Sequence, residues 1–171
     1  MTISLIAVPR PEHPTPQWER ETWVTLNGLW EFEIDKSDTG LERGLRTDSY
    51  SESILVPFAP ESQLSGVEHV DFMDSVWYRR SFRVPDSWTG RRVLLHFQAV
   101  DYDATVWVND LEVGRHRGGS TPFSLDVADA LAGRRDGVVV VRARDSRSGV
   151  QPRVKQATWF ANPGCHYTRA T

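Results

Sequence analysis

The sequence of 171 residues contains one cysteine, Cys165, and only two lysines among its 20 cationic residues. A single cysteine excludes an intrachain disulfide and a cysteine-based metal site within one chain. The apolar run Ile3–Val8 is too short for a signal peptide, and no apolar stretch is long enough to cross a bilayer. Because these features fit a reducing compartment, we expect a cytoplasmic protein with no membrane partner.

The sequence also lacks an excess of positive charge. Its net charge is −3, and no basic run is longer than two residues, so a nucleic-acid partner is not expected. No glycine-rich phosphate loop is present, and the five histidines are scattered without metal-ligand spacing. The sequence therefore predicts neither a nucleotide cofactor nor a metal site.

Aromatic residues are abundant, with seven Trp, seven Phe and four Tyr. A tryptophan can fill the core of a β-sandwich or stack on the apolar face of a sugar ring. Trp30, Trp77 and Trp107 lie in expected strand segments, and this position favours the core.

Short alternating segments separated by turn signals account for most of the chain. In residues 29–35, for example, Trp30, Phe32 and Ile34 share one face, while Glu31, Glu33 and Asp35 share the other. Similar segments are expected at residues 54–56, 76–84, 92–98, 104–108, 111–113, 123–127 and 138–144. With no long helix between them, they predict an all-β fold, an antiparallel β-sandwich of the jelly-roll type.

The first 20 residues contain four prolines, which predict an extended lead-in before a sandwich spanning residues 21–171. Two stretches between strands have no clear period. They are residues 61–74 and everything after Asp145. Gly114 and the pair Gly118-Gly119 are interpreted as the start of another loop.

Paired carboxylates are the groups that hydrolyse glycosidic bonds, and the candidates are Asp71, Asp74, Asp101 and Asp103. Asp71 and Asp74 lie in the long loop, whereas Asp101 and Asp103 flank Tyr102 before a strand, where Asp commonly caps a turn. None of the four is part of a specific catalytic motif, so no catalytic residue is assigned.

The ordered series of motifs resembles the N-terminal sugar-binding domain of glycoside hydrolase family 2, a galactose-binding-domain-like jelly roll. The similar segments are Leu26–Phe32, Val56–Phe58, Glu61-Ser62, Val76–Phe82, Leu94–Phe97, Val100–Tyr102, Val106–Asn109, Thr121–Phe123, Gln151-Pro152 and Tyr167–Arg169. Each motif alone is weak, but the series covers nearly the whole chain in the correct order.

This resemblance implies a piece of a larger enzyme. The family includes β-galactosidases, β-glucuronidases and β-mannosidases, in which an immunoglobulin-like domain and a catalytic barrel follow the jelly roll. The two catalytic glutamates of the family lie in that barrel. The resemblance therefore implies that this chain has no hydrolytic activity of its own and that it braces the barrel.

The resemblance also implies that two loops of the jelly roll help to line the sugar site. They correspond to residues 66–74, with Asp71 and Asp74, and residues 155–167, with Lys155, Gln156 and Trp159. In β-galactosidases an aspartate that helps to bind sodium precedes the tryptophan by two residues. Ala157 occupies that position here, so a sodium site of that type is not expected.

Family members continue beyond the Tyr-Thr-Arg motif with a closing strand, and this sequence stops at Thr171. We therefore expect a sandwich that lacks its final strand. The open edge would favour a homodimer in an isolated sample.

Two other functions stay open from the sequence. A free-standing carbohydrate-binding module would need an exposed aromatic platform, for which Trp77, Trp88 and Trp159 are candidates. A small self-contained glycosidase would need Asp71 and Asp74 as its catalytic pair.

Overall fold

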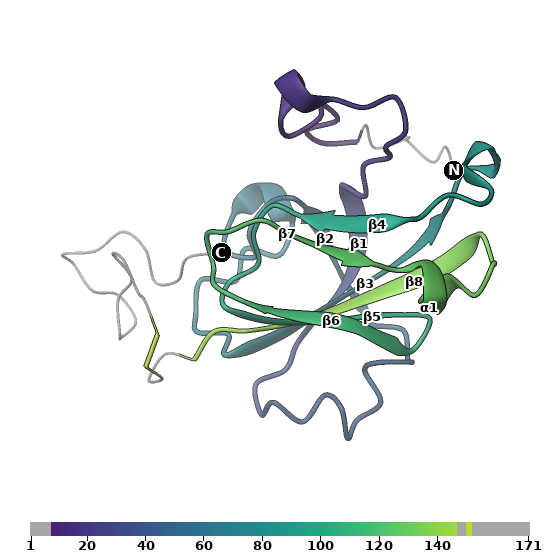
Figure 1. Cartoon of the computed structure of the whole chain (residues 1–171). Coiled ribbons are helices and arrows are strands. Elements are labelled where there is room, and N and C mark those ends of the chain that lie inside the picture. The colour runs from purple at the N-terminus through teal and green to yellow at the C-terminus, as the bar shows by residue number, and fades with distance from the viewer. Residues whose placement is uncertain (1–7, 147–149, 152–171) are drawn as a thin grey trace, which may run out of the picture.

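The chain folds as an antiparallel β-sandwich in a computed structural model that describes residues 8–146 and 150–151. Figure 1 shows a two-stranded sheet above a larger sheet of six strands. The elements in chain order are η1 (Pro16–Trp18), β1 (Gly28–Ile34), β2 (Glu52–Val56), η2 (Gln63–Ser65), β3 (Ser75–Arg83), η3 (Asp86–Trp88), β4 (Leu94–Phe97), β5 (Asp103–Val108), β6 (Leu111–Arg117), β7 (Phe123–Asp126), α1 (Ala128–Leu131) and β8 (Asp136–Arg144). The predicted all-β class is thus confirmed.

The large sheet has the strand order β2-β1-β3-β8-β5-β6, and β4 pairs with β7 in the small sheet. Every pairing is antiparallel. The main core lies between the two sheets, where inward-facing residues of β1, β3, β5 and β8 meet those of β4 and β7. Phe32, Val106 and Val139 are fully buried there.

A second, smaller core lies on the opposite face of the large sheet. The loop between β1 and β2, which hangs below the sheet in Figure 1, covers Trp77 and Trp107 with Leu45 and Tyr50. The two indole rings are stacked, with centroids 5.6 Å apart and planes inclined by 13°. This face is therefore partly a core, whereas the alternation of residues 29–35 predicts a polar surface.

The carboxylate of Asp35 holds this covering loop in place. It accepts hydrogen bonds from the Gly40 amide at 2.7 Å, the Thr39 amide at 3.1 Å and the Trp77 indole Nε1 at 3.1 Å. Gly40 is required because a Cβ atom there would lie 2.5 Å from the Trp77 Nε1. The sequence pattern places Asp35 on an exposed face, but the loop buries it completely.

The β5–β6 hairpin turns at Asn109-Asp110, as predicted. Both residues have positive φ angles, 48° and 72°, which a two-residue turn of this kind requires. The prediction of a loop from Gly114 is wrong, because β6 continues to Arg117. The strand has a glycine at this position because Leu125 of the small sheet packs directly onto it. A Cβ atom on residue 114 would lie 2.5 Å from the Leu125 Cδ2.

The expected absence of a final strand concerns residues after Gln151, which lie outside the described part of the chain. Within the described ranges, no helix is long and apolar enough to cross a membrane.

Candidate functional site

One end of the sandwich gathers the loops that the sequence singles out. The strand register places Ile34 opposite Val76, Arg144 opposite both Ser75 and Asp103, and Asp103 opposite Arg117. The segments 35–38, 71–74, 98–102, 118–122 and 145–146 therefore meet at the same end, which we call the polar end.

Asp71 and Asp74 both lie at the polar end, in the segment that leads into β3. The Asp71 side chain is exposed, and its Oδ1 accepts a hydrogen bond from the neighbouring Phe72 amide at 2.7 Å. Within residues 8–146 and 150–151, no cation pairs with Asp71. Its carboxylate therefore faces solvent, with oxygen lone pairs available to a ligand's hydroxyl groups.

Asp74 is half-buried and connects this loop to the segment after β8. Its backbone carbonyl accepts a hydrogen bond from the Asp145 amide at 3.1 Å. Asp145 is 6% exposed, and its carboxylate accepts a hydrogen bond from the Gln151 side chain. The structure thus brings the loop of Asp71 and Asp74 beside Asp145, which in turn contacts Gln151.

The remaining predicted ligand residues, Lys155, Gln156 and Trp159, lie outside the described residues. Their proximity to Asp71 and Asp74 stays a prediction.

Two other carboxylates near this end, Asp103 and Asp38, are paired with arginines. Asp103 accepts a hydrogen bond from Arg117 at 2.7 Å and lies 3.6 Å from Arg144. The hydrogen bond with Asp103 raises the pKa of the Arg117 guanidinium. Because its charge is balanced in this way, Asp103 serves the structure of the strand ends.

Asp38 forms a second ion pair at this end, 3.1 Å from Arg144. It also lies 3.9 Å from Arg142, whose guanidinium stacks over the Trp77 ring at 5.6 Å. Burial lowers the pKa of Arg142 from its usual value. This cation is held against the smaller core by Trp77 and is paired with Asp38.

Three aromatic rings stack side by side at the polar end. Phe123 lies between Phe97 at 4.7 Å and His116 at 4.3 Å, with interplanar angles of 13° and 12°. His116 Nε2 also lies 3.0 Å from the Thr121 hydroxyl. The stacked His116 ring, through its contact with Thr121, holds the 118–122 segment close to the small sheet.

Two of the aromatic platforms proposed from the sequence, Trp77 and Trp88, lie within the described residues, and neither is exposed. Trp77 is fully buried, so its candidacy is wrong. Trp88 is half-buried and packs against the main core. Trp18 is instead the exposed one, at 72%, and the sequence pattern missed it because the proline-rich lead-in has no periodicity.

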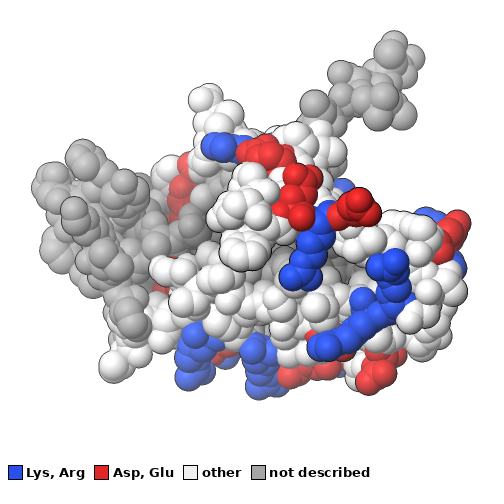
Figure 2. Space-filling view, turned by 45° about the horizontal axis from the view of Figure 1, so that its top comes forward, with Lys and Arg blue, Asp and Glu red and all other residues white. Residues whose placement is uncertain are grey.

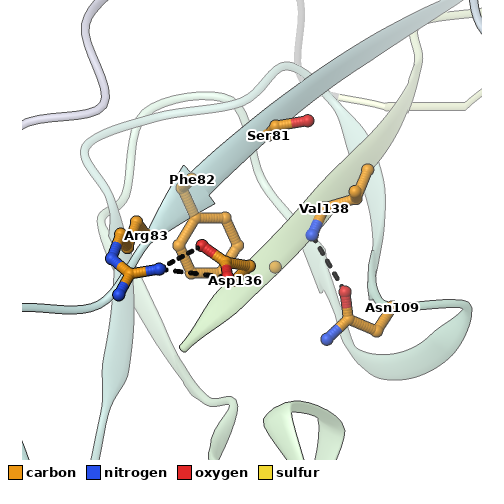
Figure 3. Close-up of a pocket in the computed structure, with 7 residues that line it drawn as sticks. Ser81, Phe82, Arg83, Asn109, Asp136 and Val138 are labelled. Carbon is orange, nitrogen blue, oxygen red and sulfur yellow. Dashed lines mark hydrogen bonds and ion pairs between the residues drawn. The ribbon is translucent and has the colours of Figure 1, made fainter. Parts of the chain in front are cut away.

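A shallow depression of about 420 Å³ lies at the opposite end of the sheet, at the junction of β3 and β8 (Figure 3). In it, Arg83 pairs with Asp136 at 3.0 Å, and the Asn109 side chain accepts a hydrogen bond from the Val138 amide at 2.9 Å. The charged side chains of the depression are thus paired with each other, and its Asn109 amide oxygen is bound to the backbone. None of the predicted site residues lines it.

Charge is mixed over the visible surface. In Figure 2 basic and acidic side chains are interspersed with broad uncharged areas on this face. The described residues also contain no group of three or more His, Cys, Asp or Glu side chains placed to hold a metal ion.

Comparison with known proteins gives a consistent result. Residues 23–152 match the model of the family described as "Glycosyl hydrolases family 2, sugar binding domain". A β-glucuronidase of Paenibacillus borealis is 34% identical over 120 residues, which cover 68% of this chain and 20% of that protein. A β-galactosidase of Thermoanaerobacter pseudethanolicus is 37% identical over 124 residues, which cover 71% and 15%.

Solved structures agree with this match. The β-glucuronidase of Lactobacillus rhamnosus superposes with a TM-score of 0.64 and 31% identity, covering 72% of this chain and 22% of that one. The chain therefore spans about a fifth of the length of these relatives.

Proposed function

The chain belongs to family 2 of the glycosyl hydrolases, as the family's sugar-binding domain, and we propose that it serves a larger β-glycosidase by bracing its catalytic barrel and lining part of its sugar site. The observation that supports this most directly is the polar end, where Asp71 presents an exposed carboxylate and the nearby Asp74 carbonyl is hydrogen-bonded to Asp145 in the segment after β8. The domain boundaries that go with this proposal are a lead-in of residues 1–20 and a sandwich of residues 21–171.

We infer that hydrolysis takes place in the missing part of the enzyme. Glycoside hydrolysis needs an acid and a nucleophile or base at a set separation, and the described carboxylates at the polar end either pair with arginines or serve loop structure. The names of the relatives favour a β-glucuronidase or a β-galactosidase, and β-glucuronides are the first substrates to test.

The contribution of the polar end can be tested in the full-length enzyme with Asp71→Asn. The change keeps the shape and removes the charge, so a hydrogen bond from a sugar hydroxyl to the carboxylate becomes weaker. We expect KM for a nitrophenyl β-glycoside to rise about tenfold, since hydrogen bonds to charged groups contribute roughly 1.5–3 kcal/mol.

Asp129→Asn is the matched control, because Asp129 is an exposed carboxylate in α1, away from the polar end. Both variants should unfold at the same urea concentration as the parent. An unchanged KM for Asp71→Asn would remove this residue from the sugar site.

A free-standing carbohydrate-binding module is the second candidate, and the exposed Trp18 is the observation that favours it. The two functions differ in what the isolated chain should bind. An accessory domain shares its pocket with the barrel wall, so calorimetry of the isolated chain with galactosides, glucuronides and mannosides should detect no submillimolar binding. Submillimolar binding would favour the module.

We also infer that the isolated chain self-associates. Within the described residues, β2 and β6 each leave one edge of the large sheet unpaired, and exposed edges template pairing with another chain. Light scattering after size exclusion should give the mass of a dimer at high concentration, and a clean monomer would contradict this.

A further inference from the structure

The segment before β1 buries little against the sandwich. From Val8 to Asn27, which we call the N-terminal arm, no residue is fully buried, and of its side chains only Leu26, beside β1, packs against the main core. Figure 1 shows the arm standing off from the two sheets. An ordered segment loses conformational entropy, and apart from Leu26 this arm offsets little of that cost by burying apolar surface in the main core.

The shape of the arm is fixed by its own contacts. The Asn27 side-chain amide donates to the carbonyls of Pro9 and Arg10, at 3.3 and 3.0 Å, and so closes the arm into a loop. Inside it, the His13 and Trp23 rings meet edge to face at 4.7 Å. Four prolines and the absence of glycine further restrict the arm, so its exposed face is preorganised.

Trp18 projects from this loop at the end of η1. Its side chain is 72% exposed, and Val24 in the same arm is 52% exposed. The Trp18 backbone amide donates a hydrogen bond to the Thr15 carbonyl at 2.8 Å, which holds the turn and leaves the indole ring facing outward. Exposed tryptophans on rigid segments are the residues that most often anchor protein–protein contacts.

We propose that the N-terminal arm is the docking element by which this domain holds the downstream catalytic part of its own enzyme, with Trp18 as the anchor. This inference rests on the proposed function and names the surface that performs the bracing. The partner that covers the arm is inferred from the length of the relatives, because this chain spans only about a fifth of each relative that it matches. Four-fifths of such an enzyme is covalently attached, and attachment raises its effective concentration at the arm.

A quenching experiment tests whether the arm becomes covered. Acrylamide quenching of the full-length enzyme and of the isolated chain is compared with that of the Trp18→Phe variant of each, so that the difference reports Trp18 alone. We expect Trp18 to be readily quenched in the isolated chain at micromolar concentration and at least about fivefold less accessible in the full-length enzyme. Equal quenching in both would overturn the proposal. Protection already present in the isolated chain would also overturn it, because the occupant would then be a second copy.

An association experiment tests the anchor and separates the two proposals. The isolated chain is titrated by calorimetry into the separately produced downstream part of the enzyme, using the parent, Trp18→Ala and Leu111→Ala. Leu111 is the matched control, because it is 52% exposed in the β5–β6 hairpin, outside the arm. Truncation of an anchoring tryptophan typically weakens binding by about thirtyfold or more, so we expect that loss for Trp18→Ala and less than about twofold for Leu111→Ala.

The outcomes are distinguishable. If all three chains bind equally, the arm is not the docking element, while the bracing function stands. If none binds, both proposals fail. A millimolar or tighter affinity of the isolated chain for glycosides that is lost in Trp18→Ala would assign the tryptophan to sugar stacking and would overturn the docking role.

Discussion

The side chain of Asp35 is fully buried beneath the loop that follows β1. Its carboxylate satisfies two backbone amides and the Trp77 indole, and Arg43 lies 3.5 Å away. A buried carboxylate is tolerated only with such partners. Its removal leaves buried donors unsatisfied, so the cost is larger than that of the hydrogen bonds alone.

We therefore predict that Asp35→Ala lowers the free energy of unfolding by about 3 kcal/mol or more. Urea unfolding followed by tryptophan fluorescence measures this value. Asp48→Ala in the same loop is the control, because Asp48 is exposed, and its change should stay within about 0.5 kcal/mol. Equal effects of the two changes would show that Asp35 does not hold the loop.

Tyr50 provides a pH-dependent test of the same loop. Burial raises the pKa of its phenol well above the usual value near 10, and its hydroxyl donates to the Leu45 carbonyl at 2.5 Å. Because the folded state favours the neutral phenol, this stabilisation is complete below about pH 10, the unfolded value, and is lost as the pH rises further.

We predict that Tyr50→Phe is less stable than the parent at pH 8, because it lacks the hydrogen bond, and that the gap narrows between pH 10 and 11. The variant has no phenol to ionise at this position, so it does not show the loss of stability at high pH that ionisation of Tyr50 causes in the parent. Urea midpoints at pH 8 and pH 11 measure the gap. A gap that stays constant would mean that Tyr50 ionises as freely in the folded state as in the unfolded state.

At the scale of elements, alternation predicted the strands because each has one face in the main core. Trp30 and Phe32 of β1 follow this rule. The outer face of the same sheet could not be predicted, because the loop after β1 covers it only through tertiary contacts. That loop buries Asp35 and Trp77, and the local sequence pattern does not predict the burial of either residue.

Gly114 shows why the length of β6 could not be predicted from the sequence. Gly114 looked like a loop residue but lies within β6, because the close approach of Leu125 requires the absence of a side chain there. For the candidate site, the positions of Asp71 and Asp74 at the polar end came from the family pattern. The ion pairs of Asp103 depend on strand register and could not be read from spacing.

We predict that Gly40→Ala opens the covering loop and destabilises the domain by about 3 kcal/mol, since overpacking a fixed core costs roughly 1–3 kcal/mol and the Asp35 contacts are lost as well. The added Cβ would meet the rigid Trp77 ring and the Asp35 carboxylate. Urea unfolding gives the stability, and a red shift of tryptophan emission reports exposure of Trp77 and Trp107.

Gly114→Ala is the comparison variant, because its added Cβ meets the end of a flexible leucine side chain. We expect it to cost only about 1 kcal/mol and to leave the emission wavelength unchanged. A smaller cost for Gly40→Ala than for Gly114→Ala would contradict the role of the covering loop as part of the core.

For the whole molecule, the ordered motifs carried more information than any residue. No single segment identified a function, yet their order along the chain predicted both the sandwich and the family, and the family match over residues 23–152 agrees. The exposed N-terminal arm did not follow from the motifs. Only the fold shows that this segment closes on itself and leaves Trp18 uncovered.

Hydrolysis is the most direct test of the view that this chain assists catalysis without performing it. Release of nitrophenol from nitrophenyl β-glucuronide and β-galactoside is measured for the isolated 171-residue chain and for the full-length enzyme, at equal concentration. The account predicts turnover by the full-length enzyme and none above background by the isolated chain. Turnover by the isolated chain that is lost in Asp71→Asn would contradict it, because the acid and base of the reaction would then lie within the sandwich itself.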